Sequence, residues 1–233
     1  MMYFDMKYIL MVMIPGLVMS GLASMLVKSS FAKWSQIGTR RGFTGAQAAK
    51  TLLDGAGIHD VQIVPTNGFL SDHYNPSTRT LALSESVYAS RSVAAVGVAC
   101  HEAGHAIQHA NSYAPLWARS ALVPAMGIGS SVGPWVIFIG LAMHMQGLAV
   151  IGCLLFGAVV LFQIVTLPVE FDASARAKRL VVEAGILDAD EQIGVNRVLN
   201  AAALTYVAAA ASSILTLLYF MMRAGLLGGR RDD

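Results

Sequence analysis

Four long apolar stretches constrain the fold of this chain more than any other feature. Each contains about 20 residues without Asp, Glu, Lys or Arg, which is the length of helix needed to cross the hydrocarbon core of a bilayer. A helix satisfies its own backbone hydrogen bonds, so it can cross lipid where irregular backbone cannot. The sequence therefore predicts a mainly α-helical, polytopic membrane protein with four transmembrane helices, over Tyr8 to Val27, about Ala121 to Met143, about Gly147 to Val169, and Ala201 to Met222.

The composition agrees with a membrane protein. Of the 233 residues, 55% are hydrophobic and only 13% are charged, whereas soluble domains carry about 25% charged residues. This excludes a disordered chain and an ordinary soluble domain in which the four stretches would be buried helices. The net charge of +2 comes with no basic stripe or aromatic platform, so we expect no nucleic-acid partner. Cys100 and Cys153 are expected to be buried and unpaired.

The apolar stretches divide the chain into segments with separate roles. The first stretch is longer than the apolar core of a signal peptide, about 7–15 residues, which favours a retained anchor over a cleaved leader. We expect an N-terminal anchor over 1–27, a polar domain over 28–120, a transmembrane hairpin over 121–169, a second polar segment over 170–200, and a fourth transmembrane helix with a short tail over 201–233. Counting the crossings places both polar segments in the same compartment.

Basic residues near the ends of the apolar stretches predict the orientation, because such residues favour the cytoplasmic side. On the side of the polar segments there are nine: Lys28, Lys33, Arg40, Arg41, Arg119, Arg176, Lys178, Arg179 and Arg197. On the opposite side there are four: Lys7, Arg223, Arg230 and Arg231. The polar segments are therefore expected to lie in the cytoplasm.

Residues 28–120 contain signals for both helices and strands. Thr44 is a candidate N-cap, and Gly55 and Gly57 are suited to end the helix that it begins. We expect helices over 44–54 and 92–111, a short helix capped by Ser84, strands over 61–64 and 78–83, and turns at 67–68 and 72–76. These elements predict a small α+β domain inserted between the first and second transmembrane helices.

The expected helix at 92–111 carries the sequence His101-Glu102-Ala103-Gly104-His105, an H-E-x-x-H pattern. Positions i and i+4 lie on one face of a helix, so both imidazoles can bind the same zinc ion at about 2.0–2.1 Å. Glu102 lies beside that face, where its carboxylate can take a proton from the water that zinc activates. Gly104 weakens a helix, which is tolerable if another segment must approach closely. The motif predicts a centre with one zinc ion.

A hydrolytic zinc site also needs a third protein ligand. Glu170, directly after the third apolar stretch, is the best candidate, and an interfacial charge capping a helix is the alternative. His109 lies about 12 Å along the helix from His101 and cannot share the ion. Asp172 could orient a ligating histidine or be a surface charge. Three further acidic residues are expected to form a solvated face: Glu183, Asp188 and Glu191.

At these residues the chain resembles the YugP-like bacterial membrane zinc metallopeptidases. The likeness covers nearly the whole chain and rests on His101 to His105, Leu167 to Ser174, Asp72 to Tyr74, Tyr113 to Leu116, and Ala201 to Ala208. The resemblance implies a neutral zinc peptidase with a zincin-like domain, in the inner membrane of a bacterium, with His101, His105 and Glu170 as ligands and Glu102 as general base. Larger related families carry Asp where this chain has Ser174, so that aspartate's role cannot be assigned here.

These features predict a zinc-dependent endopeptidase that cleaves membrane proteins or membrane-proximal segments close to the membrane surface. The candidates for orienting a ligand or holding the oxyanion are His73, Tyr74, Asp172 and Arg176, with ordinary loop or surface roles as the alternative for each. The 78–83 strand is expected beside the metal-binding helix, with a free edge for an extended peptide. Expected partners are the bilayer, a protein substrate, and a second copy or another membrane protein. The alternative function is a non-catalytic zinc-binding membrane scaffold.

Overall fold

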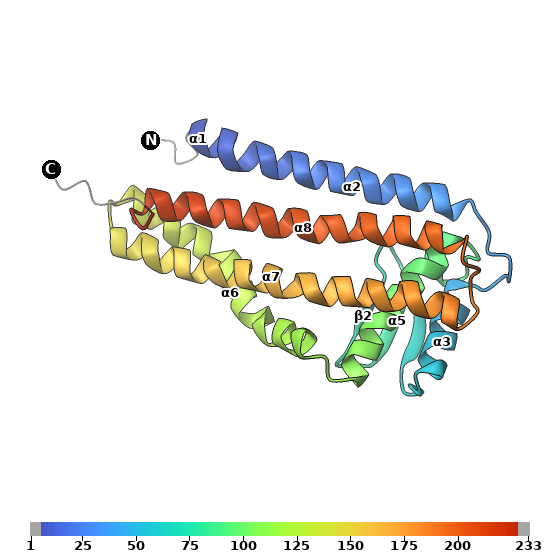
Figure 1. Ribbon diagram of the computed structural model, residues 1–233. Coiled ribbons are helices and arrows are strands. Elements are labelled where there is room, and N and C mark those ends of the chain that lie inside the picture. The colour runs from blue at the N-terminus through green and yellow to red at the C-terminus, as the bar shows by residue number, and fades with distance from the viewer. Residues whose placement is uncertain (1–5, 228–233) are drawn as a thin grey trace. The chain divides into compact units, whose positions relative to one another are not determined.

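The computed structural model describes residues 6–227 and is mainly helical, with 73% of its residues in helices (Figure 1). Its elements in chain order are α1 (Met6–Tyr8), a π-helical segment η1 (Ile9–Met13), α2 (Ile14–Ser35), α3 (Gly45–Gly55), β1 (Gln62–Thr66), β2 (His73–Asn75), β3 (Thr80–Ser84), α4 (Glu85–Tyr88), α5 (Val93–Ala110), α6 (Ala114–Ala142), α7 (Gln146–Glu183) and α8 (Gln192–Arg223). Arg230 and Arg231, which enter the charge comparison, lie outside the described residues.

Four helical segments are long and apolar enough to cross a membrane, as predicted: Met6–Ser35, Ala114–Ala142, Gln146–Glu183 and Gln192–Arg223. In each, only 11–22% of the most apolar window is buried inside the protein, so most of its side chains need an apolar solvent. Helix α7 has 38 residues and a length of about 57 Å, which exceeds the hydrocarbon core of a bilayer, about 30 Å thick. The four candidate membrane spans are therefore longer than the apolar stretches that predict them.

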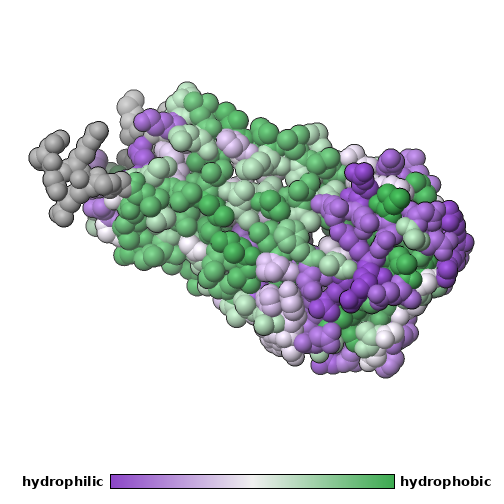
Figure 2. Space-filling view, viewed as in Figure 1, coloured by the Kyte–Doolittle hydropathy of each residue, from purple (hydrophilic) through white to green (hydrophobic). Residues whose placement is uncertain are grey.

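The chain divides into two compact units, each of which is discontinuous in sequence. The apolar unit comprises the described parts of Met1–Leu22, Trp117–Leu167 and Thr205–Asp233, and the polar unit comprises Ala23–Leu116 and Pro168–Leu204. On the face drawn in Figure 2, hydrophobic residues cover the surface of the apolar unit, and hydrophilic residues gather over the polar unit. The polar unit thus takes its residues from two stretches of chain that are separated by Trp117–Leu167, which contains most of α6 and the first part of α7.

Within the apolar unit, α6 and α7 form a closely packed antiparallel pair. A Cβ atom on Gly152 of α7 would lie 2.5 Å from the backbone nitrogen of Ile137 on α6. Gly129 and Gly140 of α6 lie equally tightly against the backbones of Leu155 and Ala149. Small residues let helix backbones approach in lipid, where the hydrophobic effect provides no attraction between helices.

The polar unit contains a three-stranded sheet in the order β1-β3-β2. Strand β3 pairs in parallel with β1 and antiparallel with β2, and Leu81 lies between Ile63 of β1 and Tyr74 of β2. Two expectations are wrong here. The segment 72–76 contains a strand as well as a turn, and β3 is the central strand, so it has no free edge for a peptide.

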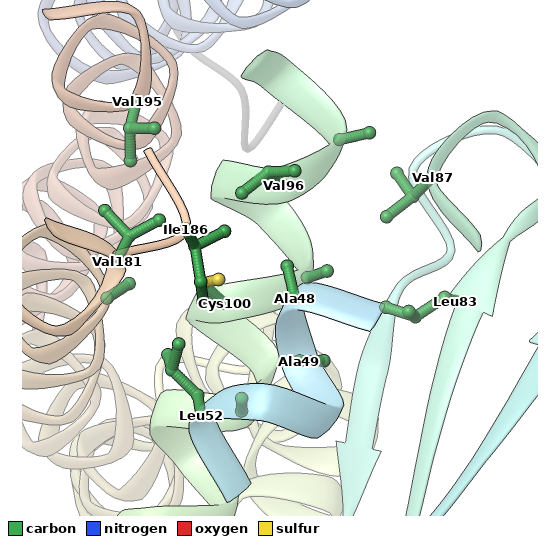
Figure 3. Close-up of a cluster of buried hydrophobic side chains, with 14 of the residues drawn as sticks. Ala48, Ala49, Leu52, Leu83, Val87, Val96, Cys100, Val181, Ile186 and Val195 are labelled. Atoms are coloured by element: carbon green, nitrogen blue, oxygen red, sulfur yellow. The ribbon is translucent and has the colours of Figure 1, made fainter. Parts of the chain in front are cut away.

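Helices α3 and α5 build the core of the polar unit. The Thr44 side chain accepts a hydrogen bond from the Gln47 backbone, and Gln47 returns one to the Thr44 backbone. This reciprocal cap confirms the predicted start of the helix. Figure 3 shows the small side chains Ala48 and Ala49 of α3 in the same buried cluster as Cys100 of α5. Cys100 and Cys153 are both free and buried, as expected.

An ion-pair cluster joins the loop after α2 to the loop before α8. Glu191 is buried and accepts hydrogen bonds from the backbone nitrogens of Arg40, at 2.8 Å, and Asp188, at 2.9 Å. The Arg40 guanidinium also pairs with Asp188 and Asp190. The expectation that Glu191 belongs to a solvated face is therefore wrong, because two backbone amides of the polar unit hold its carboxylate in the interior.

Candidate metal centre

The H-E-x-x-H residues lie on α5, which is a largely buried helix. The helix begins at Val93, where the Ser92 side chain accepts a hydrogen bond from the Ala95 backbone nitrogen at 3.2 Å. Glu102 and His105 are each 8% exposed. The side chain of His101 is 12% exposed. One helix thus holds two imidazoles and a carboxylate away from bulk water, which is costly unless they bind a partner.

Glu170 of α7 meets both histidines. Its Oε2 atom lies 3.3 Å from His101 Nε2 and 3.6 Å from His105 Nε2, and the carboxylate is 2% exposed. One ligand atom from each of the three residues can be chosen so that all lie within 4.8 Å of one another. Ligands of a tetrahedral zinc ion with bonds of about 2.0–2.1 Å are separated by about 3.3–3.4 Å. Two nitrogens and one carboxylate oxygen at these separations fit a zinc ion with one position left open.

The charges around His105 favour a cation. Burial alone would lower the pKa of His105, but the hydrogen bond that protonated His105 donates to Glu170 and the negative charges of Glu102 and Glu170 outweigh burial, so the pKa is raised. The same negative potential attracts a metal ion. Among the described residues, none donates a hydrogen bond to the Glu102 carboxylate, which is thus available to a water molecule.

Both histidines are oriented through their second ring nitrogen. His101 Nδ1 lies 3.1 Å from Ser174 Oγ, and His105 Nδ1 lies 3.0 Å from Gln108 Oε1. When Nδ1 carries the proton and donates to these oxygens, the Nε2 lone pair of each ring faces Glu170. Such hydrogen bonds fix the ring and tautomer of metal-binding histidines.

Comparisons with known proteins show the family of this chain. The model of the family described as "Putative neutral zinc metallopeptidase" matches residues 9–225. The chain belongs to this family. It is also 45% identical over 220 residues to "Putative membrane protease YugP" of Bacillus subtilis (strain 168), an alignment that covers 94% of this chain and 97% of the relative. No solved structure matches the chain.

The other candidate residues near the histidines have partners of their own. Asp172 Oδ2 accepts hydrogen bonds from Gln108 Nε2 and from Arg176 Nε, and the Arg176 guanidinium lies 5.8 Å from the centre of the Tyr113 ring. Arg176 therefore has two partners of its own in the polar unit. Tyr113 is the last residue in this series of contacts, which runs from Gln108 through Asp172 and Arg176.

The two candidates on β2 have different surroundings. The Tyr74 hydroxyl lies 2.8 Å from His109 Nδ1 and ties the strand to α5. His73 is exposed, and its Nδ1 lies 2.9 Å from the Ser71 carbonyl oxygen. His109 is absent from the three-residue metal group, in agreement with its distance along the helix.

Two residues that contact the histidines are missing from the sequence-based candidates. Gln108 is fully buried on α5, three residues after His105. Ser174 lies four residues after Glu170 on α7. Spacings of three and four residues place each side chain on the face of its neighbour. That signal was present in the sequence, but only the meeting of α5 with α7 distinguishes these residues from ordinary polar positions.

Proposed function

We propose that this protein is a zinc-dependent endopeptidase of the membrane, with one zinc ion held by His101, His105 and Glu170 and with Glu102 as general base. The observation that carries the proposal is the meeting of three ligand atoms from two helices beside a second buried carboxylate. The membership of the chain in a zinc-metallopeptidase family supports the same function. A donor set of two histidines and one glutamate is found in known catalytic zinc sites of peptidases.

The chain's own groups account for the proton transfers of peptide hydrolysis. When bound, zinc supplies a Lewis acid that lowers the pKa of water and polarises the scissile carbonyl. Glu102 accepts the proton of the attacking water as the bond from oxygen to the carbonyl carbon forms. It then gives this proton to the amide nitrogen as the carbon–nitrogen bond breaks. Burial strengthens these electrostatic interactions, because little water competes for Glu102.

The substrate strand is proposed to pair with β2. Within the described residues, β2 is an edge strand that packs against α5 and pairs with β3 on one side only (Figure 1). The opposite edge strand, β1, contains Pro65, which has no N–H group to donate to an added strand. An extended peptide is therefore better accepted at the edge beside the metal-binding helix.

The proposed substrates are membrane proteins or membrane-proximal segments. The third apolar stretch ends at Val169, and Glu170 follows it in the same helix, which supports a metal site close to the membrane surface. We further propose that a zincin-like domain is inserted between the first and second spans. The excess of basic residues beside the polar segments supports a cytoplasmic active site in the inner membrane of a bacterium.

Replacing the general base tests this function. The Glu102→Gln variant should keep its zinc but lose cleavage, so it should retain uncut membrane proteins when expressed in bacterial membranes and purified. The matched control is Glu85→Gln, an exposed carboxylate in the first turn of α4 in the same unit. New N-termini that depend on Glu102 but not on Glu85 would establish the peptidase. Bound zinc without Glu102-dependent cleavage would favour the scaffold instead.

The substrate class needs a separate comparison. A membrane-embedded model substrate should be cleaved in vesicles much faster than the same peptide bond in a soluble peptide. Equal cleavage of both, in vesicles and in detergent, would contradict the proposed preference while leaving the peptidase activity intact.

A further inference from the structure

We infer that Gln108 is a positioning residue that prepares His105 for the metal, and that Asp172 acts on the centre through Gln108. This inference rests on the proposed zinc site at His101, His105 and Glu170. It is argued from the side-chain amide of Gln108, which is fully buried and makes three polar contacts. Only one orientation of the amide lets all three contacts be hydrogen bonds.

The two hydrogen bonds donated by Gln108 fix the direction of its amide. The Nε2 atom lies 2.8 Å from the Val169 carbonyl oxygen and 2.8 Å from Asp172 Oδ2. Both of these atoms are acceptors, and a carboxylate and a carbonyl cannot donate to an amide oxygen. Rotating the amide by a half-turn would place oxygen against oxygen twice in a buried site. Gln108 Oε1 must therefore face His105.

The direction of the amide then decides the tautomer of His105. Gln108 Oε1 can only accept a hydrogen bond, so the His105 Nδ1 atom at 3.0 Å must carry a proton. A neutral imidazole has one N–H group, which leaves the Nε2 lone pair directed to the side where Glu170 lies, 3.6 Å away. Gln108 thus holds His105 in the tautomer and ring orientation that a metal requires.

Asp172 and Arg176 hold the amide in place from the other side. Arg176 Nε donates to Asp172 Oδ2 at 2.6 Å, the same oxygen that accepts from Gln108. The Arg176 guanidinium thereby keeps Asp172 as an acceptor facing Gln108. The relay from Arg176 through Asp172 and Gln108 gives His105 Nδ1 a neutral partner, and the carboxylate of Asp172 lies one residue further along the relay.

Zinc affinity of the full-length protein, measured in detergent by competition with a chelator, tests the inference. Gln108→Leu should weaken zinc binding by about 10- to 100-fold, the usual effect of removing a partner of a ligating histidine. Gln192→Leu is the matched control, because the Gln192 amide also donates to a backbone carbonyl, that of Lys178, within the same unit. The control should bind zinc within about twofold of the unmodified protein.

A double-mutant cycle tests whether Asp172 acts through Gln108. Asp172→Asn alone should weaken zinc binding, and it should have little further effect in the Gln108→Leu background. In the double variant Gln108→Glu with Asp172→Asn, position 108 still accepts from His105 Nδ1 and position 172 can donate to it, but the Val169 carbonyl loses its donor. This variant should therefore recover part of the affinity lost in Gln108→Leu. Cobalt-substituted protein gives a second measurement, since a changed His105 orientation alters the visible absorption bands.

The outcomes separate this inference from the proposed function. The inference would be overturned if Gln108→Leu bound zinc within twofold of the unmodified protein. It would also be overturned if the effects of Gln108→Leu and Asp172→Asn on zinc affinity were simply additive. Failure of the unmodified protein to bind zinc in a Glu170-dependent manner would overturn the proposed function instead. If Gln108→Leu does not fold, the double variant Gln108→Glu with Asp172→Asn and Asp172→Asn alone still decide the question.

Discussion

Gly104 of α5 lies directly against the backbone of Ala173 on α7. A Cβ atom on Gly104 would be 2.8 Å from the Ala173 carbonyl oxygen, closer than real Cβ atoms approach such a group. The glycine inside the H-E-x-x-H motif is therefore the position at which the metal-binding helix packs backbone to backbone against the helix that carries Glu170. This confirms the expectation, drawn from the low helix propensity of glycine, that another segment approaches closely here.

Gly104→Ala should separate the two helices at the metal centre. We expect a loss of about 1–3 kcal/mol in stability from overpacking, together with weaker zinc binding, because Glu170 moves with α7. Thermal unfolding and chelator competition measure the two effects. Gly55→Ala is the control, since a Cβ atom there has no neighbour within 4 Å. Unchanged stability and affinity in Gly104→Ala would show that the helices can adjust without cost.

Ser174→Ala should weaken zinc binding, because the His101 Nδ1 proton loses its acceptor at 3.1 Å. We expect an effect of about tenfold, at the lower end for a partner of a ligating histidine, since water can reach this partly exposed ring. Ser174→Asp should restore or exceed the original affinity, because a carboxylate is a stronger acceptor for the same proton. An equal loss in both variants would indicate that the size of the serine, rather than its hydroxyl, matters at this position.

Zinc binding should weaken on acidification, because the raised pKa of His105 lets a proton compete with the metal. Below that pKa, affinity should fall by about tenfold per pH unit for each proton that zinc displaces. The stability of the metal-free protein depends on pH in the opposite direction. Protonated His105 stabilises the fold below its pKa in the unfolded chain, about 6.5, and this contribution disappears as the pH rises through its higher pKa in the folded protein.

The increase in unfolding temperature caused by zinc should therefore be larger at pH 8 than at pH 6. Unfolding followed with and without zinc at both pH values measures this difference. The same zinc-induced increase at both pH values would contradict the assignment of His105 as a ligand.

Cys100 should be inert to alkylating reagents in the folded protein. Its thiol, on α5, is completely buried in the core of the polar unit, and burial raises its pKa, so little reactive thiolate forms. Labelling in a Cys153→Ala background isolates this thiol, and the additional substitution Ser77→Cys supplies an exposed control. Rapid labelling of Cys100 without denaturant would contradict the packing shown in Figure 3.

Several features of this protein follow from its sequence alone. The apolar stretches predict the four helices that are long and apolar enough to cross a membrane, because the length and hydrophobicity of such a segment are local properties. Thr44 and Ser92 mark the starts of α3 and α5 for the same reason, since an N-cap acts within one turn of helix. The H-E-x-x-H spacing likewise places His101 and His105 on one face of a single helix.

Other features depend on residues far apart in the chain, and only the tertiary structure decides them. Strand β3 is central because β2 returns to pair with it, and three residues of strand give too little periodicity to be recognised in the sequence. Ser174 becomes a partner of His101 only because α5 and α7 meet, and Val169 and Asp172 of α7 fix the direction of the Gln108 amide, in each case across more than 60 positions. Local sequence determines which helices form and which donors they carry, whereas packing determines which donors face the same point in space.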